Sequence, residues 1–107
     1  MPAAEPERSV FRAIADPTRR AMLDRLQRGP TAVNELASAF TQSRPAISKH
    51  LRILREARLV SEEKHGRERL YRLEPEQLKE VADWILPYRA FWQVSLGNLK
   101  TYLESET

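Results

Sequence analysis

The chain has 107 residues, a formal net charge of +3 and no cysteine. This length fits a single domain, and the lack of cysteine excludes disulfides, thiolate metal sites and thiol nucleophiles. Residues 1–8 hold no apolar run of the signal-peptide kind, and no stretch approaches the roughly 18 apolar residues of a membrane span, so we expect a cytoplasmic protein without membrane contact.

The charge is distributed unevenly along the chain. Residues 42–73 carry nine Lys and Arg against four Glu, whereas residues 74–107 carry three basic and six acidic side chains. A basic middle beside an acidic end indicates one anion-facing surface. A solvated helix face followed by a charged loop would give the same balance.

Two helices are predicted near the start, after residues 1–6, which we expect to be disordered. The first covers Glu7 to Ala15, and its apolar face consists of Val10, Phe11 and Ile14. The second runs from Pro17 to about Gln27 after an Asp16 N-cap, because proline fits the first helical position. The side chains expected to point inward from it are Ala21, Met22, Leu23 and Leu26.

A helix-turn-helix is predicted next. Thr31 is the expected N-cap of a helix from Ala32 to Phe40, and a three-residue break leads to a helix from about Arg44 to Ala57. Two helices joined so tightly must cross steeply. The inward residues are Val33, Leu36, Ala37 and Phe40 in the first helix, and Ile47, Leu51 and Leu54 in the second.

The periodicity then changes from that of a helix to that of strands. Residues 61–64 and 67–73 are predicted to pair as a hairpin around His65-Gly66, since glycine supplies the positive φ of a tight turn. A long helix from Pro75 to Ser105 follows, with a kink at Pro87.

The expected fold is therefore mainly α with a small β-hairpin wing. It is a winged helix-turn-helix with the order α-α-α-α-β-β-α, and residues 7–107 form its single domain.

The outward face of the helix over residues 44–57 is polar and cationic. Such a face suits a DNA major groove, where Arg44 and Lys49 can donate to guanine and Ser48 to a base or a phosphate. Free N–H groups at the helix start can bind a further phosphate. The DNA-contact candidates are Gln42, Ser43, Arg44, Pro45, Ser48, Lys49 and Arg52, although an ordinary amphipathic helix has the same pattern.

The hairpin tip adds a second cationic group. It consists of Lys64, His65, Arg67 and Arg69 around Gly66. Such a tip can lie against phosphates or in the minor groove, in a contact that is largely sequence-neutral and sensitive to salt. A solvated turn is the alternative, but a helix-turn-helix followed directly by a basic hairpin favours DNA.

The last helix is rich in aromatic residues and holds five of the eight in the chain. Aromatic side chains are typical anchors of protein interfaces, so we expect a homodimer, although packing within the chain is also open. A pocket for an unknown small-molecule effector at these aromatics is the less favoured interpretation. The expected interface residues are Val10, Phe11, Ile14, Tyr88, Trp92, Ser95, Leu99 and Tyr102.

Several motifs occur together in a characteristic order. They are Asp16-Pro17-Thr18-Arg19-Arg20, Ser48-Lys49-His50-Leu51-Arg52-Ile53-Leu54, Leu59-Val60, Gly66-Arg67 and Tyr71-Arg72-Leu73. With them the sequence resembles the bacterial arsenical-resistance repressor (ArsR) family of winged-helix regulators over nearly the whole chain.

The resemblance implies a homodimer that pairs through its first and last helices, binds double-stranded DNA at a palindromic operator and represses transcription. It places Arg44, Pro45, Ser48 and Lys49 at base-facing positions. His50 also matches a family position, and both a phosphate contact and a structural hydrogen bond are open for it.

The sequence departs from the family pattern in two respects. The third helix has no cysteine and the last has no histidine, so we expect no metal sensing and no cofactor. Arg58 stands where the family often has a helix-ending glycine. A non-glycine residue in a left-handed cap costs on the order of 1 kcal/mol, so we expect this helix to end differently.

Other functions find less support in the sequence. An enzyme is not expected, because there is no Gly-rich phosphate loop and no Ser/His/Asp set on a plausible elbow. A winged-helix protein-interaction module is the main alternative. Such a module, however, has no need for the cations on the predicted helix over residues 44–57 and on the hairpin.

Overall fold

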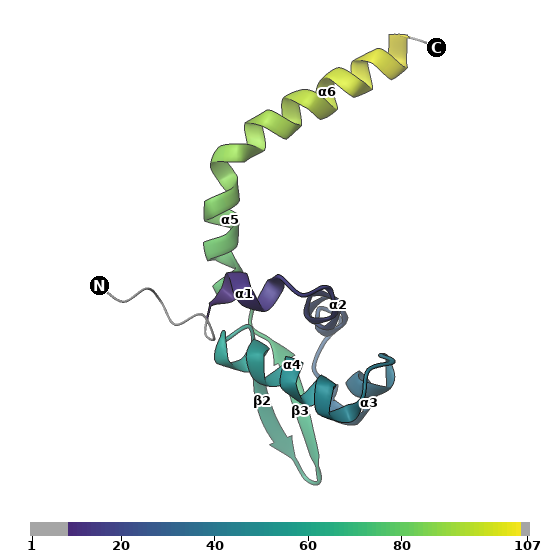
Figure 1. Ribbon diagram of the computed structural model, residues 1–107, viewed down its shortest axis with the longest axis vertical. Helices are drawn as coiled ribbons and strands as arrows, with labels where there is room; N and C mark the ends of the chain where they lie inside the picture. Colours follow the sequence, from purple (N-terminus) through teal and green to yellow (C-terminus); the bar gives the residue numbers. More distant parts are fainter. Residues whose placement is uncertain (1–8, 106–107) are drawn as a thin grey trace, which may run out of the picture.

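The computed structural model describes residues 9–105, with the side chains of residues 94–96 and 98 left out of that description. The helices are α1 (Val10–Ile14), α2 (Pro17–Leu26), α3 (Val33–Ser38), α4 (Arg44–Glu56), α5 (Lys79–Ile85) and α6 (Arg89–Ser105). The strands are β1 (Thr31–Ala32), β2 (Val60–His65) and β3 (Glu68–Leu73), and the 3-10 turns are η2 (Pro75–Leu78) and η3 (Leu86–Tyr88). Figure 1 shows a body from which α6 projects as an arm. This mainly helical fold with a small antiparallel sheet confirms the predicted winged-helix class.

The first two helices begin at side-chain caps. The Ser9 hydroxyl accepts the Arg12 N–H at the start of α1, while the predicted start at Glu7 lies outside the described residues. The Asp16 carboxylate accepts the Arg19 N–H at 3.1 Å, which confirms the predicted cap of α2. Ala21 is exposed, so its predicted inward position is wrong; it lies opposite the stripe that Met22 and the buried Arg19 share.

Thr31 is not an N-cap, contrary to the prediction. It lies in β1, where it pairs with Tyr71 of β3, and its hydroxyl donates to the Gly29 carbonyl at 3.1 Å. Helix α3 begins instead after Ala32, without a side-chain cap. The sheet therefore has three strands in the order β1-β3-β2, one more than the predicted hairpin.

Helix α4 lies across the core as its apolar spacing predicts. Ser43 caps it through the Ala46 N–H, and the break before it covers residues 39–43 rather than three residues. Its buried side chains are Ile47, Leu51, Ile53 and Leu54, of which only Ile53 was not expected. They pack in one core with Val10, Ala13, Met22, Leu23, Leu26, Leu36, Ala57, Leu59, Val60 and Tyr71.

The two long strands form a hairpin with a two-residue loop. His65 pairs with Glu68, so Gly66 and Arg67 form the turn, and Arg67 does not lie in the return strand as predicted. Gly66 has φ 62°, which confirms the conformational role expected of it.

Helix α4 ends at a left-handed residue although that residue is not glycine. Arg58 has φ 62°, its N–H donates to Arg55 O at 2.9 Å, and the Leu59 N–H donates to Leu54 O at 3.0 Å. These two bonds define a Schellman cap. The expectation that the helix would end differently is wrong, because this reversal buries Leu59 and leads Val60 into β2.

The predicted last helix is broken rather than continuous. After η2 and α5, the turn η3 contains Pro87, and α6 then leaves in a new direction (Figure 1). This confirms the predicted kink, because proline cannot continue the helical hydrogen bonds. Within the described residues, no helix combines the length and the apolar character needed to cross a membrane.

Candidate nucleic-acid interface

The outward face of α4 and the inner face of the hairpin together line one groove. Arg44, Pro45, Ser48, Lys49 and Arg52 are all exposed, on the side of α4 away from its buried residues. The groove has a volume of about 600 Å³. It is lined by Val33, Arg44, Pro45, Ser48, Lys49, Leu51, Arg52, Arg55, Glu62, Arg69 and Tyr71. Five cations and one carboxylate make it strongly basic.

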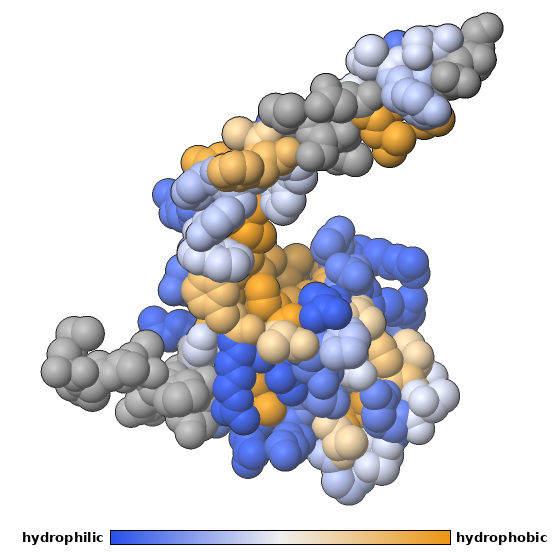
Figure 2. Space-filling model, turned by 45° about the horizontal axis from the view of Figure 1, so that its top comes forward, coloured by the Kyte–Doolittle hydropathy of each residue, from blue (hydrophilic) through white to orange (hydrophobic). Residues whose placement is uncertain are grey.

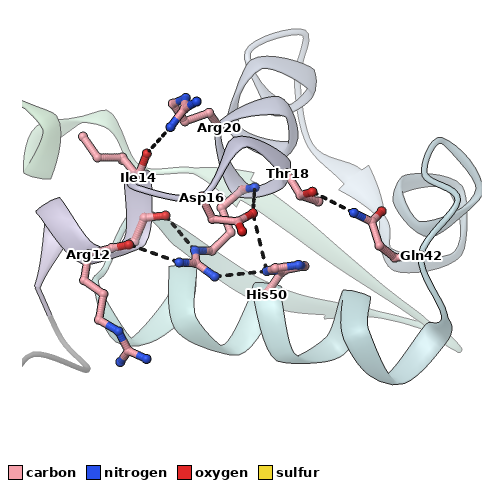
Figure 3. A network of polar contacts seen from close by, with 9 residues as sticks. Arg12, Ile14, Asp16, Thr18, Arg20, Gln42 and His50 are labelled. Atoms are coloured by element: carbon pink, nitrogen blue, oxygen red, sulfur yellow. Dashed lines mark hydrogen bonds and ion pairs between the residues drawn. The ribbon is translucent and has the colours of Figure 1, made fainter.

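Two residues before α4 hold its start in place. The Gln42 side-chain amide donates to Thr18 Oγ1 at 2.7 Å, a contact visible in Figure 3. The Ser43 hydroxyl caps the helix. Both side chains therefore have structural contacts, and their predicted contacts with DNA stay predictions.

His50 belongs to a polar network between α1, α2 and α4 (Figure 3). Its Nδ1 lies 3.1 Å from Arg19 Nη1, and Asp16 Oδ2 lies 4.0 Å from the same nitrogen. Because a guanidinium group only donates, Nδ1 is the acceptor in this contact. His50 thus makes the structural hydrogen bond, one of the two alternatives, and a phosphate contact stays a prediction.

Arg19 is the centre of this network and is only 9% exposed. Its Nε donates to Ala13 O at 2.7 Å and its Nη2 to Arg12 O at 3.1 Å, both at the end of α1. Burial opposes ionisation of Asp16, but the Arg19 N–H and the neighbouring His50 and Arg19 side chains outweigh it, so the pKa of Asp16 lies below its ordinary value. The network fixes α1 and α2 against α4.

The tip of the hairpin is cationic and open. Lys64, His65 and Arg67 are exposed; His65 Nε2 lies 3.4 Å from Glu63, while neither Lys64 nor Arg67 forms an ion pair in the part of the chain that the structure describes. Across the same residues, no three His, Cys, Asp or Glu side chains come together as a metal site would need.

Arg69 was predicted with the tip but lies in β3, where it lines the groove beside α4. Its Nη1 is 2.8 Å from Glu62 Oε1, and Arg55 Nη1 is 3.0 Å from Glu62 Oε2. The Tyr71 hydroxyl donates to Glu62 Oε2 at 2.5 Å. We call Arg55, Glu62, Arg69 and Tyr71 the Glu62 cluster.

The Glu62 cluster shifts two pKa values in opposite directions. The hydrogen bond from Tyr71, together with the nearby Arg69 and Arg55, holds the pKa of Glu62 below its ordinary value. Burial and the carboxylate raise the pKa of Tyr71 to about 12. The sequence prediction missed Glu62 and Arg55. The strand register, which pairs Glu62 with Tyr71, is needed to find the first, and the packing of α4 on β2 is needed to find the second.

The predicted dimer residues divide into two groups. Val10 is 5% exposed and belongs to the core of its own protomer, and Ile14 also packs against that core. A place for these two residues in an interface stays a prediction. Phe11 packs edge-to-face on Trp84 at 5.8 Å, which is the packing within the chain that the sequence left open. Tyr88, Trp92, Leu99 and Tyr102 are exposed, and the Ser95 side chain lies outside the described residues.

Exposed apolar surface accompanies these aromatic residues along the last helices. Figure 2 shows it gathered where the arm meets the body and continuing in patches along the arm. Trp84, Leu86 and Leu103 contribute in addition to the predicted residues. So large an apolar surface is typical of a protein interface.

Comparisons with known proteins agree with this geometry. Residues 16–62, from the cap of α2 into β2, match the family described as bacterial regulatory protein, arsR family. The HTH-type transcriptional regulator Rv2034 of Mycobacterium tuberculosis is 41% identical over 101 residues, which cover 94% of this chain and 91% of the relative. The transcriptional repressor SdpR of Bacillus subtilis is 39% identical over 80 residues, covering 75% of this chain and 89% of the repressor.

A solved structure extends the likeness to the fold. The crystal structure of an ArsR family transcriptional regulator, RHA00566, is similar with a TM-score of 0.70 and 38% identity. The match covers 86% of this chain and 97% of that one.

Proposed function

Because the chain belongs to the arsR family of bacterial regulatory proteins, we propose that it is a homodimeric transcriptional repressor that binds a palindromic operator in the cytoplasm. The family makes it a DNA-binding transcriptional regulator and not an enzyme. The observation that carries the proposal is the basic groove that α4 and the hairpin line together.

In this proposal the first turns of α4 read base edges in the major groove. Arg44 and Lys49 donate to guanine O6 and N7, Ser48 contacts a base or a phosphate, and Pro45 packs on a thymine methyl. All four side chains are exposed on one face of α4. Gln42 and Ser43 hold the helix start near a phosphate, with Arg52 and His50 farther along the same helix.

The hairpin supplies contacts that carry little sequence information. Lys64, His65 and Arg67 lie at its tip, where they suit phosphates or the minor groove. Arg69 lies closer to α4 and reaches the backbone beside the major groove. These contacts set the position of α4 on the duplex and make binding depend on salt.

A homodimer explains the exposed aromatic surface of the last helices. Trp92 and Tyr88 are half-exposed in the single chain, and a partner that covers them would remove apolar surface from water. A two-fold dimer presents two α4 helices, so its operator is palindromic, with half-sites roughly 34–36 Å apart. Repression follows if that operator overlaps a promoter.

Selection of DNA from a random duplex pool at about 150 mM salt tests the proposal. The expected result is a palindrome with two-fold spacing. Arg44→Ala and Lys49→Ala should relax the preference at single positions of each half-site, at a cost of about 1–3 kcal/mol per lost base contact. Arg20→Ala is the matched control, since it removes an exposed cation outside the groove.

Weak binding without sequence preference would contradict the proposal. Only the electrostatic part of DNA binding would then be present. The protein-interaction module would become the better interpretation of the fold.

A further inference from the structure

The Glu62 cluster joins α4 to the hairpin inside the groove. We propose that Glu62 is a specificity-determining positioning residue. It holds Arg55 and Arg69 in place so that they bind DNA phosphates in only one register, that is, at one position of the protein along the duplex. This inference rests on the proposed function and adds to it a role for a carboxylate that faces DNA.

The cluster draws its members from three elements. Arg55 comes from α4, Glu62 from β2, and Arg69 and Tyr71 from β3. Each carboxylate oxygen of Glu62 accepts from one arginine, at 3.0 and 2.8 Å, and the Tyr71 hydroxyl binds one of these oxygens too. Glu62, itself in β2, is thereby held from β3 and from α4.

The arginines keep most of their donors for DNA. A guanidinium group has five N–H donors in a fixed fork, and each arginine uses one nitrogen on Glu62. Their side chains are 45% and 62% exposed, whereas that of Glu62 is 20% exposed. The carboxylate is therefore less exposed than the two guanidinium groups, which line the groove together with it.

A carboxylate in this place opposes DNA binding by its charge. Phosphate contacts are sequence-neutral, and a freely moving arginine binds a phosphate in any register. A fixed arginine binds only where a phosphate falls at its position, so the contact orients the protein on the duplex. Glu62 thus weakens binding to random DNA and makes the remaining phosphate contacts depend on register.

Stability alone does not explain the cluster. Exposed ion pairs contribute little to folding, and buried Leu51, Leu54 and Val60 already pack in the core between the helix and the hairpin. A neutral residue at position 62 would serve this packing without placing a negative charge in a DNA-binding groove.

Comparison of Glu62→Gln with Glu63→Gln tests the proposal. Both substitutions remove one negative charge from β2, but Glu63 is exposed and pairs with Arg72 at 3.6 Å and with His65 at 3.4 Å, neither of which belongs to the cluster. Dissociation constants are measured for the selected operator and for a random duplex of equal length, over a range of salt. Both variants should bind random DNA more tightly.

The specificity ratio is the measurement that separates the two variants. For Glu62→Gln the affinity for the operator relative to random DNA should fall about tenfold, because two phosphate contacts lose their register. For Glu63→Gln the ratio should stay within about twofold of the wild type. Thermal unfolding of each variant confirms that it is folded.

Tyr71→Phe tests the orientation of Glu62 without a change of charge. It keeps the buried ring and removes only the hydroxyl that donates to Glu62. The affinity for the operator relative to random DNA should fall by several-fold, while the salt dependence of binding stays unchanged. This variant tests the proposal if Glu62→Gln does not fold.

The possible failures are distinguishable. If the wild type selects an operator but Glu62→Gln and Glu63→Gln keep equal ratios, Glu62 acts by charge alone and the inference is overturned. An unchanged ratio in Tyr71→Phe overturns it as well. If the wild type selects no sequence, the proposed function fails, and the inference fails with it.

Discussion

Arg19 shows that the residues which hold a side chain in place can be distant from it in the sequence. It is in the first turn of α2, where an arginine is ordinarily solvated, yet it is buried against Ala13, Arg12 and His50. A buried charge requires partners, and here two backbone carbonyls and a ring nitrogen supply them. Helical periodicity does not reveal such partners, because His50 is 31 positions away in sequence.

Arg58→Gly should stabilise the protein. Arg58 has φ 62° at the end of α4, a conformation that glycine adopts without the steric cost of a Cβ. We expect a gain of about 0.5–1 kcal/mol in the free energy of unfolding, measured by urea denaturation, since the cost of glycine in the unfolded state offsets part of the relief.

The control is the same substitution inside the helix. Arg52 is exposed in the middle of α4, so Arg52→Gly should lower the free energy of unfolding by about 1 kcal/mol. Equal effects of the two substitutions would show that φ at position 58 is not a source of strain.

At the scale of elements, sequence patterns are reliable where one apolar stripe dominates. The buried positions of α4 follow the expected spacing, and Pro87 breaks the last helix as expected. Strand β1 has only two residues, too few for a period, and it forms only because β3 offers it an edge.

Trp92→Ala should weaken the proposed dimer. Trp92 is half-exposed on α6, and loss of an aromatic anchor from an interface typically costs about 2 kcal/mol or more. We expect the dissociation constant of the dimer to rise by tenfold or more in sedimentation equilibrium. Circular dichroism should show the helix content unchanged.

Gln93→Ala is the matched control for this experiment. Gln93 is the next residue of α6 and is exposed too, but it is polar and offers little apolar surface to a partner. The dissociation constant of the Gln93→Ala dimer should stay within about twofold of the wild type. If Trp92→Ala dimerises as strongly as Gln93→Ala, α6 does not provide the interface through Trp92.

At the scale of the whole molecule, the basic groove and the exposed aromatic surface lie on different elements. The hairpin tip and the end of α6 lie at opposite ends in Figure 1. The candidate DNA-binding cations lie in the groove and at the hairpin tip, whereas the exposed aromatic residues lie in α1, α5, η3 and α6. This separation lets one surface hold a partner while the other remains open to DNA.

The stability of the whole molecule should fall in acid. Asp16 and Glu62 have pKa values below their ordinary values of 3.8 and 4.5, so the unfolded chain binds protons more readily than the folded one. Their contribution is complete above the ordinary values and is lost as the pH falls through the lowered ones.

Urea denaturation between about pH 7 and pH 3 measures this effect. Glu62→Gln lacks one of the two carboxyl groups, so its deficit relative to the wild type should be largest near neutral pH and shrink in acid. A deficit that is constant over this range would contradict the link between Glu62 ionisation and stability.

The sequence by itself determined the features that depend on near neighbours. Four such features each depend on residues within a few positions of one another. They are the cap at Asp16, the apolar stripe of α4, the turn at Gly66 and the break at Pro87. The basic groove could be anticipated as well, because helix spacing places Arg44, Lys49 and Arg52 away from the core.

Only the tertiary structure decided which distant side chains meet. The register of β2 against β3 brings Glu62 beside Tyr71, and the packing of α4 on β2 adds Arg55. The same packing placed Val10 in the core, Thr31 in a strand and Arg19 beneath His50. Such contacts depend on the relative placement of whole elements, which the burial of many apolar side chains determines jointly and no local pattern specifies.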